Sequence, residues 1–366
     1  RAVKHQAEPH LTPWWVARYF SSMTTTRSYQ KVTVFGGGSF GTALAELCAQ
    51  QGQSVCLWMR DEVQARAINE THHNPRYLSD HELHSGISAT SELGVALSEP
   101  DWIIIAIPSQ AVRALLEQCR DDFPEVPLVL AAKGIENGTL KTMDEVVADV
   151  LGESWSHRTM AMSGPSFAKE IVQGLPTSVV VACRDEALSA SICDTLFSDV
   201  FRAYSSSDIV GVEIGGALKN VMAIAAGGVI GMGLGMNVRA ALVTRGLSEM
   251  TKIALAKGAN PLTLSGLAGV GDLLLTCTGG LSRNRAVGQA LGEGKSLQEA
   301  QEAIGQVAEG VRTAKSAYEL VKSLEVDCPI IETVYRVIYE DEPVMEAFRA
   351  LVRRHPGQEM NYTTQD

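Results

Sequence analysis

The sequence is short of several residue types, and each shortage excludes a class of protein. Its seven cysteines are scattered and form no CxxC pair, which argues against a disulfide scaffold or a structural zinc site and favours a reducing compartment. Lysine and arginine number 31 against 42 acidic residues, and the net charge of −11 argues against a general binder of nucleic acids or anionic membranes. An anionic ligand must therefore be bound by a local cluster of basic residues.

Histidine and long hydrophobic runs are also scarce. Residues 158–354 contain no histidine, so a proton-transfer group in that half must be another residue type. His72, His73, His81 and His84 lie close together, but their spacing matches none of the common zinc patterns, and we expect a solvated loop. The uncharged run 221–236 is too short and too rich in glycine to predict a membrane span.

The composition that remains indicates two globular domains. The 366 residues exceed one ordinary core, and 45% hydrophobic with 20% charged residues is typical of soluble globular proteins. Strand patterns fill residues 31–207, helical periods fill 208–354, and a polar tail occupies 355–366. We interpret residues 1–30 as a non-native or disordered extension with Met23 as the natural start, and a transit peptide as the alternative.

The first predicted strand is followed at once by a glycine-rich turn. The run 31–35 (KVTVF) precedes GGGSFG at 36–41, and a helical pattern follows. Gly36 permits the tight turn, Gly38 lets the backbone approach a pyrophosphate, and Gly41 lets helix and strand pack closely. The N-terminus of the helix favours anions. This order of elements predicts a Rossmann-type dinucleotide site rather than a purely structural turn.

The end of the second strand bears on the choice of dinucleotide. The strand predicted at 53–58 is followed by Met59, Arg60 and Asp61. Arg60 could bind the 2′-phosphate of NADPH, while Asp61 could accept a ribose hydroxyl, so the sequence favours NADPH and leaves NADH open. The alternative is that Arg60 is an ordinary solvated residue.

Five further runs complete the predicted sheet, at 101–107, 128–132, 159–162, 178–183 and 201–204. The first, DWIIIAI, is continuously apolar, as a parallel sheet covered on both faces requires. Lys133 follows the second, where open α/β sheets bind ligands, so it is a candidate anion contact, with a surface charge as the alternative. Ser163 or Ser166 is expected to cap a helix starting near Phe167, at the same crevice.

The stretch 208–237 predicts a helix with no polar face. Between Asp208 and Arg239 only Glu213 and Lys219 are charged, so we expect this helix in the middle of a domain. Burial lowers the pKa of a lysine, which can then exchange protons near neutral pH. Alternatively, Lys219 pairs with Glu213 or extends to the domain edge. The glycine-rich end, 227–235, indicates a helix that fades into a flexible loop.

A single carboxylate, Asp272, lies within the apolar run 267–277 (LAGVGDLLLTC), beyond an amphipathic helix predicted at 240–257. An unpaired buried carboxylate is as unfavourable as a buried lysine, so we expect Asp272 to meet Lys219. A second interpretation, compatible with the first, is that Asp272 caps the helix that begins there.

The run 279–285 (GGLSRNR) opens another helix, with Ser282 as its N-cap. Arg283 and Arg285 lie in the first turn, against the preference of the helix dipole for acidic residues. An external phosphate between the two arginines would explain their placement, and a solvated basic turn is the alternative. The last helical segment starts at 306–310 (QVAEG) and continues through Pro329 to about residue 354.

Together these motifs resemble the bacterial NAD(P)-dependent glycerol-3-phosphate dehydrogenases. The similarity covers about residues 31–340 and rests on GGGSFGTALA, AAKGIE, SGPSFAKE, VGVEIGGALKNVMAIAAG, LAGVGDLLLTC, SRNRAVG and QVAEGV, in this order. It implies an α/β N-terminal Rossmann-type domain with a mostly parallel sheet and an all-α C-terminal domain. It also implies that 31–207 binds the dinucleotide and 208–354 carries the substrate and catalytic groups.

The resemblance assigns a role to each motif residue. Lys219 is similar to the family's proton donor and acceptor, with Asp272 beside it. The implied substrate contacts are Lys133, Gly164, Ser166, Lys219, Asn220, Asp272, Thr276, Ser282, Arg283 and Asn284. The implied contacts to NADPH or NADH are Gly36, Gly38, Ser39, Phe40, Gly41, Arg60, Lys133, Ala168, Arg283, Val307 and Glu309, and no metal ligand is implied.

The expected activity is the interconversion of dihydroxyacetone phosphate and sn-glycerol 3-phosphate in the cytoplasm, which supplies phospholipid synthesis. We expect a small-molecule substrate, no nucleic acid and no membrane insertion, and the sequence is compatible with a homodimer. One alternative is a dehydrogenase of the β-hydroxyacid type, which needs a receptor for a carboxylate rather than a phosphate. The other is a dinucleotide sensor without turnover, which leaves Lys219, Asp272 and Arg283 without a purpose.

Overall fold

Eight strands form one sheet, in the order β3-β2-β1-β4-β5-β6-β7-β8, in the computed structural model, which describes residues 29–355. Strands β1 to β6 are parallel, β7 is antiparallel to β6, and β8 is parallel to β7. The strands are β1 (Lys31–Phe35), β2 (Ser54–Trp58), β3 (Ile87–Thr90), β4 (Trp102–Ile105), β5 (Leu128–Leu130), β6 (Thr159–Ser163), β7 (Thr177–Cys183) and β8 (Phe201–Ser206). The mostly parallel sheet predicted from the sequence is confirmed, and β3 is the strand that the sequence analysis missed.

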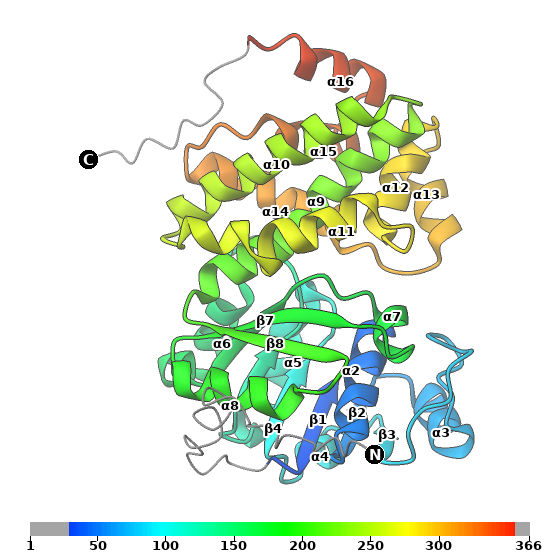
Figure 1. Ribbon diagram of the computed structural model, residues 1–366, viewed down its shortest axis with the longest axis vertical. Coiled ribbons are helices and arrows are strands. Elements are labelled where there is room, and N and C mark those ends of the chain that lie inside the picture. The colour runs from blue at the N-terminus through cyan, green and yellow to red at the C-terminus, as the bar shows by residue number, and fades with distance from the viewer. Residues whose placement is uncertain (1–28, 356–366) are drawn as a thin grey trace, which may run out of the picture.

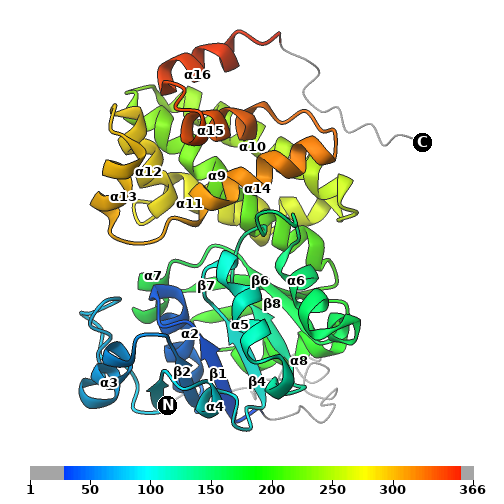
Figure 2. The same cartoon turned by 180° about the vertical axis from the view of Figure 1, so that it is seen from behind.

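Helices cover both faces of this sheet (Figure 1, Figure 2). They are α2 (Ser39–Gln50), α3 (Glu62–Thr71), α4 (Leu93–Ala96), α5 (Val112–Gln118), α6 (Met143–Leu151), α7 (Ala168–Val172) and α8 (Glu186–Leu196). Strand β4 is buried on both faces, and successive side chains of a strand point to opposite faces of the sheet, so both faces need a cover of helices. Ile104 packs in the core cluster that contains Leu44 of α2, whereas Ile103 and Ile105 pack in the cluster that contains Leu116 of α5.

A helical domain lies above the carboxyl edge of the sheet (Figure 1). Its helices are α9 (Ile209–Gly231), α10 (Met236–Ala256), α11 (Asp272–Thr278), α12 (Arg283–Gly292), α13 (Leu297–Ile304), α14 (Glu309–Ser323), α15 (Pro329–Tyr339) and α16 (Val344–Val352). Helix α9 packs against α10, α11, α12, α14 and α15. It is long and apolar enough to cross a membrane by composition, but 89% of its most apolar window is buried inside the molecule. This is the central position that its sequence predicts.

The glycine-rich end of α9 corrects one expectation. The helix does not fade at 227 but continues to Gly231, and α10 begins at Met236 rather than at residue 240. A β-carbon on Gly227 would lie 2.0 Å from the carbonyl oxygen of Arg285, and one on Gly288 would lie 1.9 Å from that of Ile224. These glycines, together with Gly231 and Gly292, form a glycine seam in which the backbones of α9 and α12 touch directly.

The sheet gives way to the helical part of the chain between β8 and α9. Strand β8 ends at Ser206, and Asp208 caps α9 by accepting a hydrogen bond from the amide of Gly211 at 3.0 Å. The predicted start at Met23, the rest of the 1–28 segment and the tail 356–366 lie outside the described residues. The carboxyl edge of the sheet faces the helical domain, and a functional site is expected between them.

Candidate active site

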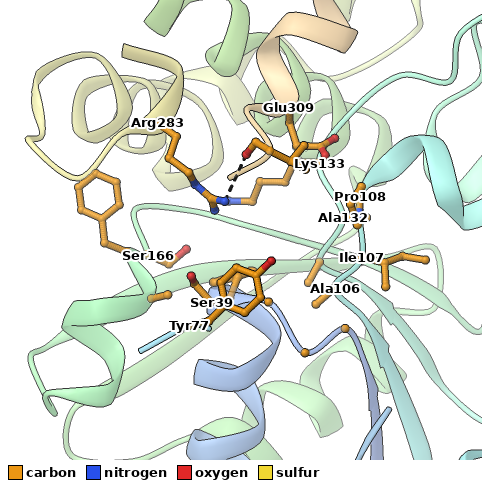
Figure 3. A pocket seen from close by; sticks show the side chains of 18 of the residues that line it. Ser39, Tyr77, Ala106, Ile107, Pro108, Ala132, Lys133, Ser166, Arg283 and Glu309 are labelled. Atoms are coloured by element: carbon orange, nitrogen blue, oxygen red, sulfur yellow. Dashed lines mark hydrogen bonds between the residues drawn. The ribbon is translucent and has the colours of Figure 1, made fainter. Parts of the chain in front are cut away.

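A cavity of about 440 Å³ lies between the two domains, at the carboxyl ends of the parallel strands. Ser39 and Tyr77 approach it from the sheet side, whereas Arg283 and Glu309 approach it from the helical side (Figure 3). Sixteen of the site residues predicted from the sequence line it, namely Gly36, Gly38, Ser39, Phe40, Arg60, Lys133, Ser166, Ala168, Lys219, Asn220, Thr276, Ser282, Arg283, Asn284, Val307 and Glu309. Gly41, Gly164 and Asp272 lie behind its wall.

The glycine turn has the shape of a phosphate cradle. Gly36 has a φ of +132°, and a β-carbon there would lie 2.5 Å from the carbonyl oxygen of Ala106. A β-carbon on Gly41 would lie 1.9 Å from the carbonyl oxygen of Gly36, so this glycine lets α2 pack on the strand. Gly38 meets nothing within 4 Å, and no side chain caps the N-terminus of α2. The free amide groups of α2 and the open space at Gly38 fit the pyrophosphate of a dinucleotide.

At the adenosine end, the carboxylate of Asp61 is already engaged. One oxygen caps α3 by accepting a hydrogen bond from the amide of Gln64 at 3.1 Å, and the other is 3.4 Å from the guanidinium of Arg76. Arg60 and Arg76 both line the cavity and carry exposed side chains. Two guanidinium groups and one carboxylate therefore lie at this edge of the cavity.

Lys219 and Asp272 meet in the wall of the cavity. Lys219 Nζ donates a hydrogen bond to Oδ1 of Asp272, and the two side chains are 8% and 1% exposed. Lys219 lies in the middle of α9, and Asp272 is the first residue of α11, after the short π-helical turn 267–271. The pairing expected from the sequence is confirmed. Glu213, the alternative partner, instead accepts a hydrogen bond from the amide of Asp144 at 3.0 Å.

A second lysine shares the same carboxylate. Lys133 Nζ lies 2.9 Å from Oδ2 of Asp272, and Asp272 does not cap α11, whose N-cap is Gly271. Burial lowers the pKa of Lys219 to about 7. The negative charge of Asp272 opposes this change, whereas the positive charge of Lys133 lowers the pKa further. Burial alone would raise the pKa of Asp272, but the charges of Lys133 and Lys219 hold it below its ordinary value. The carboxylate thus stays ionised, and the amine of Lys219 can exchange a proton near neutral pH.

The N-terminus of α12 lies at the cavity, but the structure corrects the role expected for one of its two arginines. Ser282 caps the helix by accepting a hydrogen bond from the amide of Arg285 at 3.3 Å. Arg283 lines the cavity, where its guanidinium donates to Oε1 of Gln306 at 3.1 Å. Arg285 does not line the cavity. Its guanidinium donates to the carbonyl of Gly279 at 2.9 Å and so holds the loop that precedes α12. The prediction of a phosphate held between two arginines is therefore wrong, and Arg283 alone of the two faces the cavity.

Neither predicted cap of the helix after β6 is present. Helix α7 begins at Ala168, and its N-cap is Phe167, without a side-chain hydrogen bond. Ser166 donates to the carbonyl of Gly164 at 2.9 Å, and Ser163 donates to Asp272 at 3.1 Å. Ser166 therefore stabilises the turn at Gly164, and Ser163 contacts the buried charge of Asp272, so neither caps the free amides of α7.

A family model described as the NAD-dependent glycerol-3-phosphate dehydrogenase N-terminus matches residues 31–189, and one described as the C-terminus matches 208–349. Together they cover most of the chain. It belongs to this family.

Individual relatives agree with the family match. A glycerol-3-phosphate dehydrogenase [NAD(P)+] of Anaeromyxobacter dehalogenans is 50% identical over 331 residues, which cover 90% of this chain and 100% of the relative. The enzyme of the same name from Myxococcus xanthus is 46% identical and covers 90% and 98%. The crystal structure of glycerol-3-phosphate dehydrogenase from Coxiella burnetii has a TM-score of 0.85 at 36% identity and covers 89% and 100%.

Within this family fold, the sequence analysis missed the wall built by the histidine-rich loop. Asn74 is fully buried and donates to the carbonyl of Gly37 at 3.0 Å and to Oγ1 of Thr42 at 2.9 Å. It thereby ties the loop to the glycine turn and brings Tyr77 to the cavity (Figure 3). The signal in the sequence was Asn74-Pro75, a polar turn that the neighbouring histidines obscured.

A second missed contact joins the domains. Ser109, in the short helical turn that follows β4, donates from its hydroxyl to Oε2 of Glu309 on α14 at 2.8 Å. Burial raises the pKa of Glu309, while the hydrogen bonds from Ser109 oppose that rise. The Rossmann and helical domains are therefore linked at the cavity by a carboxylate as well as by the lysines.

Proposed function

We propose that this chain interconverts dihydroxyacetone phosphate and sn-glycerol 3-phosphate, with Lys219 as the proton donor and acceptor. The observation that carries the assignment is the buried ion pair of Lys219 with Asp272 at the wall of a cavity that begins at the glycine turn. NADPH or NADH, when bound, supplies the hydride for the carbonyl carbon. The protein supplies the proton, the orientation and the dry surroundings.

Lys219 holds the transferable proton at Nζ. As the carbonyl oxygen of dihydroxyacetone phosphate gains negative charge, the ammonium donates its proton to that oxygen. Asp272 keeps the amine oriented through its Oδ1, and the nearby charge of Lys133 favours release of the proton. In the reverse direction, neutral Lys219 takes the proton from the hydroxyl group.

The phosphate end of the substrate is assigned to the N-terminus of α12. Ser282, Arg283 and Asn284 line the cavity there, and a helix N-terminus favours an anion. Asn284 also donates to Oδ1 of Asn220 at 2.8 Å, which links the phosphate end to the residue after Lys219. Lys133, Ser166 and Thr276 complete the substrate side of the cavity, with Gly164 behind it.

The dinucleotide is assigned to the other end of the cavity. Gly36, Gly38, Ser39 and Phe40 would hold the pyrophosphate, with Gly41 closing the packing behind them. Arg60 would hold the 2′-phosphate of NADPH. Towards the nicotinamide, the assigned contacts are Lys133, Ala168, Arg283, Val307 and Glu309.

A spectrophotometric assay tests the assignment. Purified protein with dihydroxyacetone phosphate should oxidise NADPH, and NADH to a lesser extent because Arg60 and Arg76 make the adenosine edge basic. Turnover of a 3-hydroxy acid without turnover of dihydroxyacetone phosphate would point to a β-hydroxyacid dehydrogenase. Binding of NADPH with no turnover on any triose phosphate would point to a sensor.

We also infer a cytoplasmic enzyme that supplies glycerol phosphate for phospholipid synthesis, and a homodimer is compatible with the sequence. The scattered cysteines support the reducing compartment, since six of the seven are buried and all seven are free. Light scattering on the purified protein measures the assembly, and cell fractionation measures the location. A monomer in the first experiment would contradict the dimer without touching the activity.

A further inference from the structure

The carboxylate of Asp272 is held from both domains at once. Its Oδ1 faces the helical domain and accepts from Lys219. Its Oδ2 faces the sheet and accepts from Lys133 at 2.9 Å, from the Ser163 hydroxyl at 3.1 Å and from the Gly164 amide at 3.2 Å. The reaction as described so far uses the two lysines but leaves the two neutral donors to Oδ2, Ser163 and Gly164, without a role.

The two unused donors are fixed by the backbone. Ser163 is the last residue of β6 and is 3% exposed. Gly164 has a φ of +151°, and a β-carbon there would lie 2.8 Å from the Cα of Val179. Only glycine therefore fits at this position, and the backbone amide of Gly164 keeps its direction toward Asp272. On the opposite side, a β-carbon on Gly216 of α9 would lie 2.8 Å from Oγ of Ser163. Gly216 therefore leaves room for this hydroxyl.

We propose that Ser163 is a positioning residue for the proton transfer, which fixes Oδ2 of Asp272 so that Oδ1 stays directed at Lys219. This inference rests on the proposed function, because it assumes that Lys219 transfers the proton. Ser163 does not line the cavity, so it acts on the reaction through Asp272. A carboxylate held at one oxygen by two neutral donors cannot rotate, and its second oxygen keeps a fixed direction toward the lysine.

The charged and titratable groups around this carboxylate are few. Lys133 faces it from the loop after β5, and Lys219 faces it from α9. The thiol of Cys277 lies on α11 within electrostatic range of both Asp272 and Lys219. Without the Ser163 hydroxyl, Oδ1 of Asp272 is no longer held toward Lys219, and the ion pair that raises the pKa of this lysine is weakened. The alkaline limb of the pH profile for reduction then moves to lower pH.

Ser163→Ala is the first test, in the full chain with dihydroxyacetone phosphate and NADPH. We expect kcat to fall about tenfold, as for the loss of a hydrogen bond to a charged group, while the KM for dihydroxyacetone phosphate and the binding of NADPH measured by fluorescence stay within about twofold. Ser163→Cys keeps a weak donor and should restore part of kcat. Ser189→Ala is the matched control, because Ser189 is also buried and donates to the carbonyl of Val181, and neither of these residues lines the cavity.

Gly216→Ala is an independent test that leaves Ser163 in place. Its methyl group would displace the hydroxyl, so it should reproduce both the loss of kcat and the shift of the pH profile to lower pH that are expected for Ser163→Ala. Gly228→Ala is its control, because it lies on the same helix and its β-carbon would meet its nearest atom at an ordinary 3.5 Å. Glycine-to-alanine changes inside a helix otherwise favour the helix.

The outcomes separate the inference from the proposed function. A wild-type protein that reduces dihydroxyacetone phosphate, with Ser163→Ala at wild-type kcat and an unmoved pH profile, overturns the role of Ser163 and leaves the function intact. If Ser163→Ala and Ser189→Ala lose equal amounts of Tm and of activity, and the pH profile does not move, the role of Ser163 is overturned as well. A wild-type protein with no such reduction overturns the proposed function first.

Discussion

Two buried carboxylates of the helical domain, Asp272 and Glu249, have opposite electrostatics. Glu249 lies in α10, is 4% exposed and accepts hydrogen bonds from the amides of Ile330 at 2.8 Å and Ile331 at 3.1 Å, at the N-terminus of α15. Burial raises its pKa to about 8, although the two amides oppose the rise. Asp272 is buried as deeply, yet its pKa lies below the ordinary value.

The difference lies in what surrounds each group. Asp272 is in direct contact with two ammonium groups, whereas Glu249 is held by backbone amides and has Lys252 only at longer range. Burial alone therefore does not make a carboxylate catalytic. The paired cations keep the carboxylate of Asp272 charged, and burial together with the repulsion of Lys133 brings Lys219 into the range where it can exchange protons. The carboxyl group of Glu249 instead joins two helices.

Removing the amine should have the largest effect on this contrast. In Lys219→Ala we expect kcat to fall by a factor on the order of 10² or more, because the transition state loses its proton donor. NADPH affinity should stay nearly unchanged. Lys257→Ala is the control, since that lysine also forms an ion pair, with Glu145 at 2.7 Å, but does not line the cavity. Near-normal turnover of Lys219→Ala would refute the assignment.

Removing the charge of the carboxylate should have the next largest effect. In Asp272→Asn we expect kcat at neutral pH to fall about tenfold or more, because Lys219 and Lys133 then repel each other without a counter-charge. The pKa of Lys219 should fall further, so the remaining reductase activity should move to lower pH. A pH profile identical to wild type would show that Asp272 does not set the protonation of Lys219.

The wild-type enzyme should show the coupling directly. Reduction needs the protonated amine, so its rate is full below the pKa of Lys219, about 7, and declines as the pH rises through that value. Oxidation needs the neutral amine and should rise over the same range. Initial rates in both directions across neutral pH measure this, and parallel profiles would contradict it.

The smallest effect is expected at Glu249, on stability rather than on rate. A carboxyl group with a raised pKa in the folded state holds a proton that the unfolded chain has lost, so its stabilisation is full below about 4.5 and declines toward pH 8 by at most about 1.4 kcal/mol per unit. Glu249→Gln should remove this slope and cost about 1–2 kcal/mol at acidic pH, where one amide loses its acceptor.

Urea unfolding at about pH 5 and about pH 8 measures the difference. The exposed Glu302→Gln on α13 is the matched control and should leave both the slope and the midpoint unchanged. If Glu249→Gln keeps the wild-type slope, the pH dependence comes from another group.

Much of the site could be predicted because its residues are anomalous where they stand. Lys219 and Asp272 are each the wrong residue type for an apolar run, and a mutual pairing resolves both anomalies. The direction of Arg285 could not be predicted, since it depends on a carbonyl of the preceding loop. Asn74 was missed because its buried partners, Gly37 and Thr42, are more than thirty residues away.

The fold shows the same limit. Strands with continuous apolar runs were found, whereas β3 (ISAT) has a single large apolar residue and too little pattern. The glycines of α9 predicted a weakened helix, because in one dimension glycine only loosens a helix. These glycines are needed for close packing against the glycines of α12, which lie some sixty residues away in the sequence.

That seam fixes the distance between two helices that line the cavity. A β-carbon on Gly227, Gly231, Gly288 or Gly292 would meet the backbone of the other helix, so α9 and α12 cannot adjust their spacing at these points by repacking side chains. In the proposed function the carbonyl lies at Lys219 on α9 and the phosphate at Arg283 on α12, so we expect selection by the distance between these two groups.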